Sequence, residues 1–298
     1  MKETATLYPH APLHKMQELF YRLAASGLVS PKRFRAPMPV AADRKPSPAF
    51  PSLEIVSHCW KYSRMLAYQL SSFVLYPPSK LAVRITVFYA ESDAETVALL
   101  KFIGEHVIPN LVWNWQPLPE EQLFRRSIGR NRAALVTQAD WIWMTDCDIV
   151  FHKGCLDSLA EVLLGKTDAL VFPQDVLITE LLPDSAPMLR DRPALALREI
   201  DTNLFHSQPR DRAKGPFQIM HGDVARAIGY CDRIGLYQTP AAHWCKCYED
   251  RAFRWLLETQ GTPVNIVNAC QIRHVEKGRY RRHSVLSSIR RRIRKKQR

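Results

Sequence analysis

The sequence predicts an α/β fold in which a mostly parallel central sheet is covered by helices on both faces. From residue 53 onward, short β-prone runs alternate with helical segments, as in chains that build such sheets. The chain has 298 residues, enough for one large domain with short additions at its ends. Its 46% hydrophobic and 24% charged residues are ordinary for a globular protein. No apolar stretch approaches ~18 residues, so no membrane-spanning helix is expected.

Residues 1–52 are predicted to form an N-terminal helix and a proline-rich connector. Leu13, Met16, Leu19, Phe20 and Leu23 recur at steps of three and four residues, which predicts an amphipathic helix over residues 13–28. Six prolines between residues 31 and 51 exclude a continuous helix or an interior strand there.

The elements of the main domain, residues 53–280, follow in alternation. Strands are expected at residues 53–56, 81–89, 141–144 and 169–172, and helices at 62–73, 94–106, 122–138 and 251–259. Because alternating elements of this kind form parallel sheets, polar residues that follow the strands are expected to meet at one edge of the sheet.

The positive charge of the chain is concentrated at one end. Residues 277–298 contain eleven basic and no acidic residues, whereas the 31 basic and 29 acidic residues of the remainder nearly balance. A nucleic-acid-binding domain would carry this charge on its folded surface, so no nucleic-acid partner is expected.

Residues 281–298 are predicted to form a basic amphipathic tail. Val285, Leu286, Ile289 and Ile293 are at helical spacing among arginines and lysines, which favours contact with an anionic membrane surface. The alternative is a disordered, solubilising tail. The seven cysteines are scattered and the N-terminus lacks a secretory signal, so we expect a cytoplasmic protein, peripheral on the inner face of the cell membrane.

Two aspartates after the strand at 141–144 are the most informative feature. Asp146 and Asp148 are two residues apart, so in an extended chain their carboxylates point to the same side. A divalent ion such as Mn²⁺ or Mg²⁺ would relieve their repulsion and could hold a diphosphate. The alternative is a solvated turn, since aspartate is common in turns.

The order of several motifs resembles one enzyme family. Before the aspartates comes the run Gly129-Arg130-Asn131-Arg132-Ala133-Ala134, and after them comes the pair Glu249-Asp250. Together with the strand that ends near Ser57, these motifs resemble the GT-A glycosyltransferases, in particular the nucleotide-sugar-dependent family 2, over about residues 53–280. The resemblance implies a Rossmann-like GT-A fold.

The resemblance also implies roles for individual residues. Asp250 would be the general base, with Glu249 beside it, and Asp146, Asp148 and His274 would hold the metal. The nucleotide-sugar contacts would come from Ser57, His58, Glu91, Asp93, Arg130, Asn131, Asp146 and Cys147. The acceptor contacts would come from Gly222, Asp223, His243 and Trp244. From the residues alone, Glu249-Asp250 could instead cap a helix, and His58, Trp244 and His274 could be structural.

The implied activity is transfer of a single hexose from a nucleotide sugar, UDP-linked, to a glycan or glycolipid acceptor in cell-envelope polysaccharide synthesis. Family resemblance implies a divalent cofactor and inversion at the anomeric carbon. The Gln-x-x-Arg-Trp motif of processive synthases is absent from the sequence, which favours one sugar per encounter. Two alternatives stay open: a haloacid-dehalogenase-type phosphohydrolase that uses Asp146 and Asp148, and a non-catalytic nucleotide- or glycan-binding module.

Overall fold

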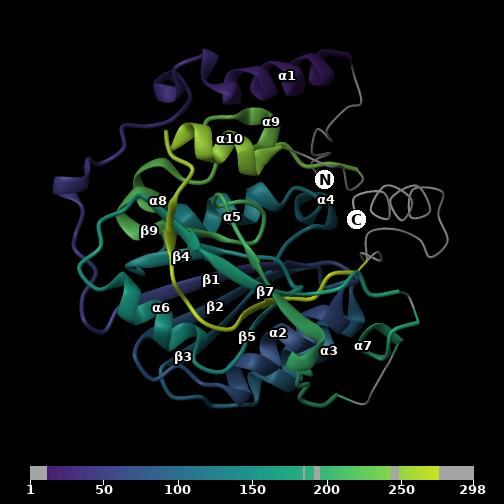
Figure 1. Ribbon diagram of the computed structural model, residues 1–298. Helices are drawn as coiled ribbons and strands as arrows, with labels where there is room; N and C mark the ends of the chain where they lie inside the picture. Colours follow the sequence, from purple (N-terminus) through teal and green to yellow (C-terminus); the bar gives the residue numbers. More distant parts are fainter. Residues whose placement is uncertain (1–11, 184, 191–194, 243–247, 275–298) are drawn as a thin grey trace.

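A computed structural model describes residues 12–183, 185–190, 195–242 and 248–274 (Figure 1). The predicted basic tail, and the predicted acceptor residues His243 and Trp244, lie outside the described residues. No helix in the described ranges is both long enough and apolar enough to cross a bilayer.

The central sheet has seven strands in the order β10-β6-β9-β4-β1-β2-β3. They are β1 (Ser52–Cys59), β2 (Ala82–Tyr89), β3 (Leu111–Pro117), β4 (Trp141–Met144), β6 (Leu170–Pro173), β9 (Gln218–His221) and β10 (Thr262–Val264). All neighbouring pairs are parallel except those of β9, which runs antiparallel to β4 and β6. The mostly parallel α/β sheet is therefore confirmed.

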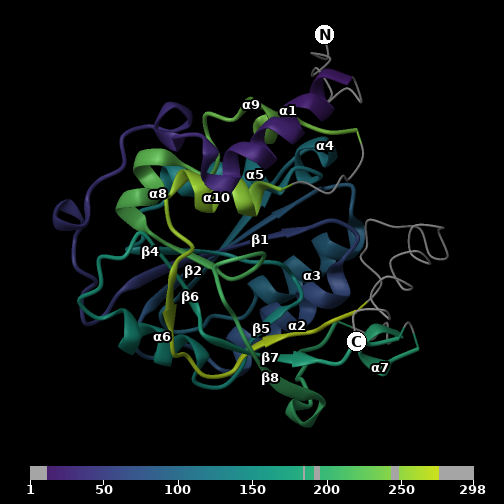
Figure 2. The same cartoon turned by 45° about the horizontal axis from the view of Figure 1, so that its top comes forward.

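Helices cover both faces of this sheet (Figures 1 and 2). One face packs against α2 (Ser63–Leu75), α3 (Ala94–Gly104) and α6 (Cys155–Leu163); the other packs against α5 (Arg126–Val136), α8 (Gly222–Ile228), α9 (Gly235–Gln238) and α10 (Glu249–Leu256). Alternate residues of the strands enter the two cores: Ile55 and Trp143 pack on the first side, Val56 and Met144 on the second. This alternation explains why the strands read as continuous apolar runs.

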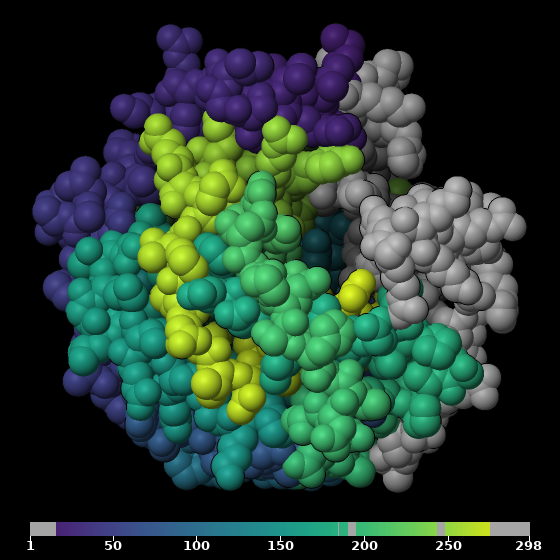
Figure 3. Space-filling view, in the orientation of Figure 1, coloured from purple at the N-terminus to yellow at the C-terminus, as the bar shows by residue number. Residues whose placement is uncertain are grey.

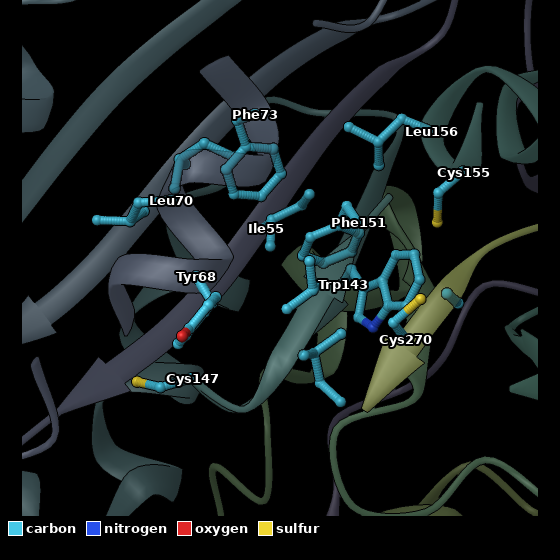
Figure 4. Packing of buried hydrophobic residues seen from close by; sticks show 14 of the residues in the cluster. Ile55, Tyr68, Leu70, Phe73, Trp143, Cys147, Phe151, Cys155, Leu156 and Cys270 are labelled. Carbon is cyan, nitrogen blue, oxygen red and sulfur yellow. The ribbon is translucent and has the colours of Figure 1, made fainter. Parts of the chain in front are cut away.

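Aromatic side chains fill the first core (Figure 4). The Phe151 ring stacks on Phe73 with 5.0 Å between centroids and meets the edge of Trp143 at 4.9 Å. Phe151 belongs to β5 (Ile149–Phe151), so these contacts attach a second sheet to the first.

The second sheet, in the order β5-β11-β7-β8, was not predicted. It consists of β5 (Ile149–Phe151), β7 (Asp175–Thr179), β8 (Phe205–Pro209) and β11 (Ala269–Gln271), with the short helix α7 (Pro187–Arg190) after β7. β5 and β11 have three residues each, too few to show a period of two, and they pair although they lie far apart in the chain.

The helix predicted at 122–138 is divided in two. It consists of α4 (Glu120–Leu123) and α5, because Arg125 between them has a non-helical backbone (φ −115°, ψ 85°) and a fully buried side chain. The run that starts at Gly129 therefore lies inside α5, one turn after its first residue, Arg126.

The N-terminal segment packs on the second helical layer. Helix α1 (Pro12–Leu23) continues into a π-helical turn that ends after Gly27, which has a positive φ of 97°. In residues 31–51 the only helical elements are two short 3₁₀ turns, Pro31–Phe34 and Ala41–Asp43. The indole of Trp255 in α10 donates a hydrogen bond to the Val29 carbonyl at 2.8 Å.

Candidate active site

The loop that carries Asp146 and Asp148 follows β4 near the middle of the sheet, and a buried glutamine fixes its backbone. Gln69 of α2 donates from Nε2 to the carbonyls of Asp146 at 2.8 Å and Ile149 at 3.0 Å. Its Oε1 accepts from the Ser57 hydroxyl at 2.5 Å. Ser57 is fully buried and its hydroxyl anchors Gln69, so its geometry does not support the predicted contact with the nucleotide sugar. Gln69 was missed because nothing local in α2 points to a distant loop.

Two arginines of α5 bind Asp146. Arg126 and Arg130 are four residues apart and so lie on one face of the helix. Arg126 donates to Oδ1 of Asp146, and Nη2 of Arg130 lies 3.4 Å from the same oxygen. Arg130 was predicted to contact the donor, whereas Arg126 was missed although its spacing from Arg130 could have shown it.

The same arginines reach the acidic pair at the start of α10. Nη1 of Arg130 lies 3.2 Å from Oδ1 of Asp250, and Nη2 of Arg126 lies 3.5 Å from Oε1 of Glu249. The hydroxyl of Tyr230 lies 3.1 Å from Oδ1 of Asp250, and the Gly215 amide donates to Oδ2 at 3.0 Å. The fold therefore joins the Asp-x-Asp loop and the Glu249-Asp250 pair, which are about a hundred residues apart in the sequence, through two guanidinium groups.

Burial sets the protonation of these groups. It raises the pKa of Asp250; Arg130 opposes this shift, and the nearby Glu249 adds to it. Burial lowers the pKa of Arg130, but Tyr230, Asp250 and Asp146 outweigh it, so its net pKa is raised and it stays charged. Burial also raises the pKa of Tyr230, which keeps its hydroxyl neutral. Asp250 is thus a partly exposed carboxylate with a raised proton affinity, which suits a general base.

The charge balance of the cluster favours a cation. Three carboxylates, those of Asp146, Glu249 and Asp250, pair with two guanidinium groups, and the remaining negative charge would repel a diphosphate. Mg²⁺ and Mn²⁺ prefer oxygen ligands and are often held by one or two carboxylates together with substrate phosphates. The carboxylate oxygens of Asp146 and of Asp148, which is buried, are of the chemical kind that such an ion binds.

His274 does not join these aspartates. Its Nε2 is hydrogen-bonded to the Tyr62 hydroxyl, with the two rings 5.3 Å apart. Within the described ranges no three His, Cys, Asp or Glu side chains are close enough together to hold one ion. The prediction of His274 as a third metal ligand is therefore not supported by the geometry.

Three residues predicted to contact the nucleotide make hydrogen bonds within the chain. Asp93 caps α3, accepting from the Thr96 hydroxyl at 2.7 Å and from the Lys61 amide at 2.6 Å. Asn131 accepts from the Tyr230 amide at 2.8 Å and so positions Tyr230. Cys147 is buried, and its thiol donates to the His58 carbonyl at 3.1 Å. Glu91 is exposed in the turn after β2, and its contact with the nucleotide stays a prediction.

The His58 ring packs inside the domain. It stacks on Phe88 with 5.0 Å between centroids, and a Cβ added to Gly129 would lie 2.2 Å from its Nε2. Both ring nitrogens are buried without a hydrogen-bond partner among the described residues. Burial and the charges of Arg130 and Arg126 lower the pKa of His58 well below 6.5. The His58 ring is therefore neutral and packed among other side chains, in agreement with the structural alternative for this residue.

Gly222 and Asp223 lie at the opposite edge of the sheet. Because β9 is antiparallel to β4, Gln218 pairs with Met144, close to Asp146, whereas His221 pairs with Trp141 at the other end. Asp223 accepts from the Lys45 amide at 2.9 Å and from Arg226 at 2.6 Å. The prediction that Gly222 and Asp223 contact the acceptor is inconsistent with this position.

A groove of about 530 Å³ opens at that same far edge, at the start of β1, β2 and β3. Its lining includes Glu54, Arg84 and Val112, and it contains none of the residues predicted for the active site. The candidate active site is therefore defined by its side-chain network and not by this groove.

Similar solved structures are glycosyltransferases. A mannosyltransferase from Pyrobaculum calidifontis, PcManGT, in complex with GDP-Man and Mn²⁺, is 16% identical over 94% of this chain and 69% of that chain, with a TM-score of 0.42. S. aureus TarS 1–349 is 12% identical over 75% of this chain, with a TM-score of 0.41, and its complex with UDP-GlcNAc over 80%, with 0.45. This chain spans 60% of the TarS chain in both cases. No family model and no curated protein matches the sequence.

Proposed function

We propose that this chain is a glycosyltransferase that moves a single hexose from a nucleotide sugar, UDP-linked, to a glycan or glycolipid acceptor. One observation carries the proposal: Arg130, fully buried, binds both Asp146 of the Asp-x-Asp loop and Asp250 at the start of α10. This network would place the donor phosphates beside the proposed base, and sugar transfer depends on such positioning.

The residues take different parts in the proposed reaction. Asp250 accepts the proton of the acceptor hydroxyl, whose oxygen attacks the anomeric carbon as the bond to the nucleotide diphosphate breaks, with inversion. Arg130 and Tyr230 hold Asp250 in place. Asp146 and Asp148 would hold a Mn²⁺ or Mg²⁺ ion, which neutralises charge on the leaving diphosphate when bound.

Further parts of the proposal concern residues outside the described ranges. His243 and Trp244 precede α10 in the sequence and are proposed to contact the acceptor. The basic tail is proposed to hold the protein on the inner face of the cell membrane, where a glycolipid acceptor and cell-envelope polysaccharide synthesis would be found.

The substitution Asp250→Asn tests the base. It removes the proton acceptor but keeps a side chain of the same shape, so transfer should fall by about 10²–10⁴-fold while donor affinity changes little. Nucleotide release from UDP- and GDP-sugars with Mn²⁺ measures transfer, and calorimetric titration measures donor binding. Asp211→Asn, an exposed acid outside the network, is the matched control.

Each rival predicts a different result in this assay. Transfer that persists in Asp250→Asn places the base elsewhere. Hydrolysis of simple phosphomonoesters by the wild type identifies a phosphohydrolase, and donor binding without turnover identifies a binding module.

A further inference from the structure

Helix α1 presents its apolar side to solvent. Met16, Leu19, Phe20 and Leu23 follow one another at three- and four-residue steps, so they form one stripe along the helix. Met16 is 67% exposed, Leu19 55% and Leu23 54%. A surface helix of a globular domain normally turns such a stripe toward the core. Here the opposite side packs inward, through Tyr21 of α1 and the buried Ala24 that directly follows it.

The stripe lies at the outer rim of the molecule. In Figures 1 and 3, α1 (purple) lies across one edge, on the outer side of α10. Leu28, in the turn that follows α1, is a further exposed apolar side chain, at 81%. A contiguous exposed patch of this kind marks an interaction site more often than an exposed single side chain does.

Basic side chains border the stripe. Arg22 is exposed in the last turn of α1, and Lys32 and Arg33 are exposed in the neighbouring turn. That turn is beside α1 because the Phe34 ring lies 6.0 Å from Phe20 and 5.9 Å from Tyr21. Between residues 12 and 34 the sequence has four basic residues and one acidic residue, Glu18.

We infer that α1 is a docking surface for an anionic lipid bilayer, with its leucine-rich stripe inserted among the headgroups. An apolar stripe bordered by lysine and arginine is the pattern of helices that lie in the membrane interface. A second copy of the chain fits less well, because a two-fold contact through α1 would bring the same cations of both copies together. This surface is separate from the basic tail.

Several contacts join α1 to the rest of the domain, so the orientation of α1 on a membrane would set the orientation of the domain. The guanidinium group of Arg22 lies 4.4 Å from the ring centre of Tyr248, the residue before α10. Nε of Arg251 donates to the Ala25 carbonyl at 3.4 Å, and Tyr21 packs on Tyr237 of α9. Docking of α1 therefore fixes how α9 and α10 face the membrane.

Vesicle flotation of the full chain tests the inference. Wild type should float with vesicles of 30% phosphatidylglycerol in phosphatidylcholine and bind pure phosphatidylcholine more weakly. Leu19→Glu/Leu23→Glu should weaken binding to the anionic vesicles by about tenfold or more, because it places charge in the inserted stripe. The matched control, Val107→Glu/Val112→Glu, adds the same charge at two exposed valines far from α1 in the sequence and should bind as wild type does.

The remaining outcomes overturn the inference. They are equal flotation of wild type and the leucine variant, absence of binding by wild type, and a wild-type dimer in light scattering that the leucine variant converts to monomer without any vesicle binding. If the leucine variant has a lower thermal midpoint, Leu19→Ser/Leu23→Ser replaces it, with Val107→Ser/Val112→Ser as its control, and the same outcomes apply.

Discussion

Arg130 is the residue on which the charge balance of the site depends most. Its side chain is fully buried and lies 3.4 Å from Asp146 and 3.2 Å from Asp250. A buried guanidinium loses its hydration, and two carboxylates and the Tyr230 hydroxyl replace it. Arg130 is therefore both a structural residue and a positioning residue for Asp250.

Loss of this guanidinium should destabilise the whole domain. Arg130→Met leaves the two carboxylates without their shared partner, and breaking a buried pair costs about 3–5 kcal/mol; we expect the lower end because Asp250 is partly exposed. Urea unfolding at pH 7 measures the change. Arg132→Met, on the exposed side of the same helix, should change stability by less than about 0.5 kcal/mol. Equal stability of both variants would contradict this.

His58 should make stability depend on pH. Its folded pKa lies well below 6.5, its usual value when unfolded, so below pH 6.5 the unfolded chain binds a proton that the folded chain excludes. Stability is then lost as the pH falls, by up to roughly 1.4 kcal/mol per pH unit. Chemical denaturation between pH 7.5 and 5 should show a smaller loss for His58→Phe than for wild type. Parallel curves would show that His58 is not the responsible group.

Helix α5 carries a glycine that packs closely on the sheet and two arginines that bind the acidic residues of the site. Gly129 lies against His58 and Phe88, while Arg126 and Arg130, on either side of it in the sequence, reach the acidic residues. The absence of a side chain at Gly129 lets the helix approach β1 and β2 closely enough for the arginines to reach the end of β4.

Gly129→Ala should disturb this helix. The added Cβ would lie 2.2 Å from Nε2 of His58 and 2.8 Å from Cδ2 of Phe88, and the two stacked rings leave it no space. Overpacking of this kind costs about 1–3 kcal/mol, which thermal unfolding can measure. Gly235→Ala, in α9 with no atom within 4 Å of its new Cβ, is the control and should be neutral or slightly stabilising. Wild-type stability of Gly129→Ala would show that the rings can move aside.

The N-terminal segment is part of the same packed body as the sheet domain. The Phe34 ring lies 5.3 Å from Trp255 of α10, and Arg35 pairs with Glu258 at 2.7 Å. The boundary expected at residue 52 separates the segment by composition, whereas these contacts join it to the second helical layer.

Phe34→Ala should therefore lower the stability of the whole chain. We expect a loss of about 2 kcal/mol, less than for a fully buried phenylalanine, with one cooperative transition in both circular dichroism and tryptophan fluorescence. Phe50→Ala, at a half-exposed ring, is the control. An unchanged main transition with a separate early one would instead make residues 12–51 an independent unit.

Local sequence was enough to predict four strands of the central sheet, β1, β2, β4 and β6, and the position of the aspartates, whereas β3, β9 and β10 were missed. The strand at 141–144 was predicted with its observed bounds, and Asp146 and Asp148 follow it, because a buried parallel strand is an apolar run that ends in polar residues. The helices α2 and α3 also follow from their periodicity. Such features depend on residues that are a few positions apart, so they can be predicted from the sequence alone.

Long-range pairing decided everything else. The antiparallel direction of β9 moved Gly222 and Asp223 to the far edge, and the second sheet joins strands from distant parts of the chain. The partners of Arg126 and Arg130 at α10 follow from the same closure of the fold. Only the tertiary structure shows that the apolar stripe of α1 faces solvent. A helical period shows which residues share a side of the helix, but not which side the rest of the molecule covers.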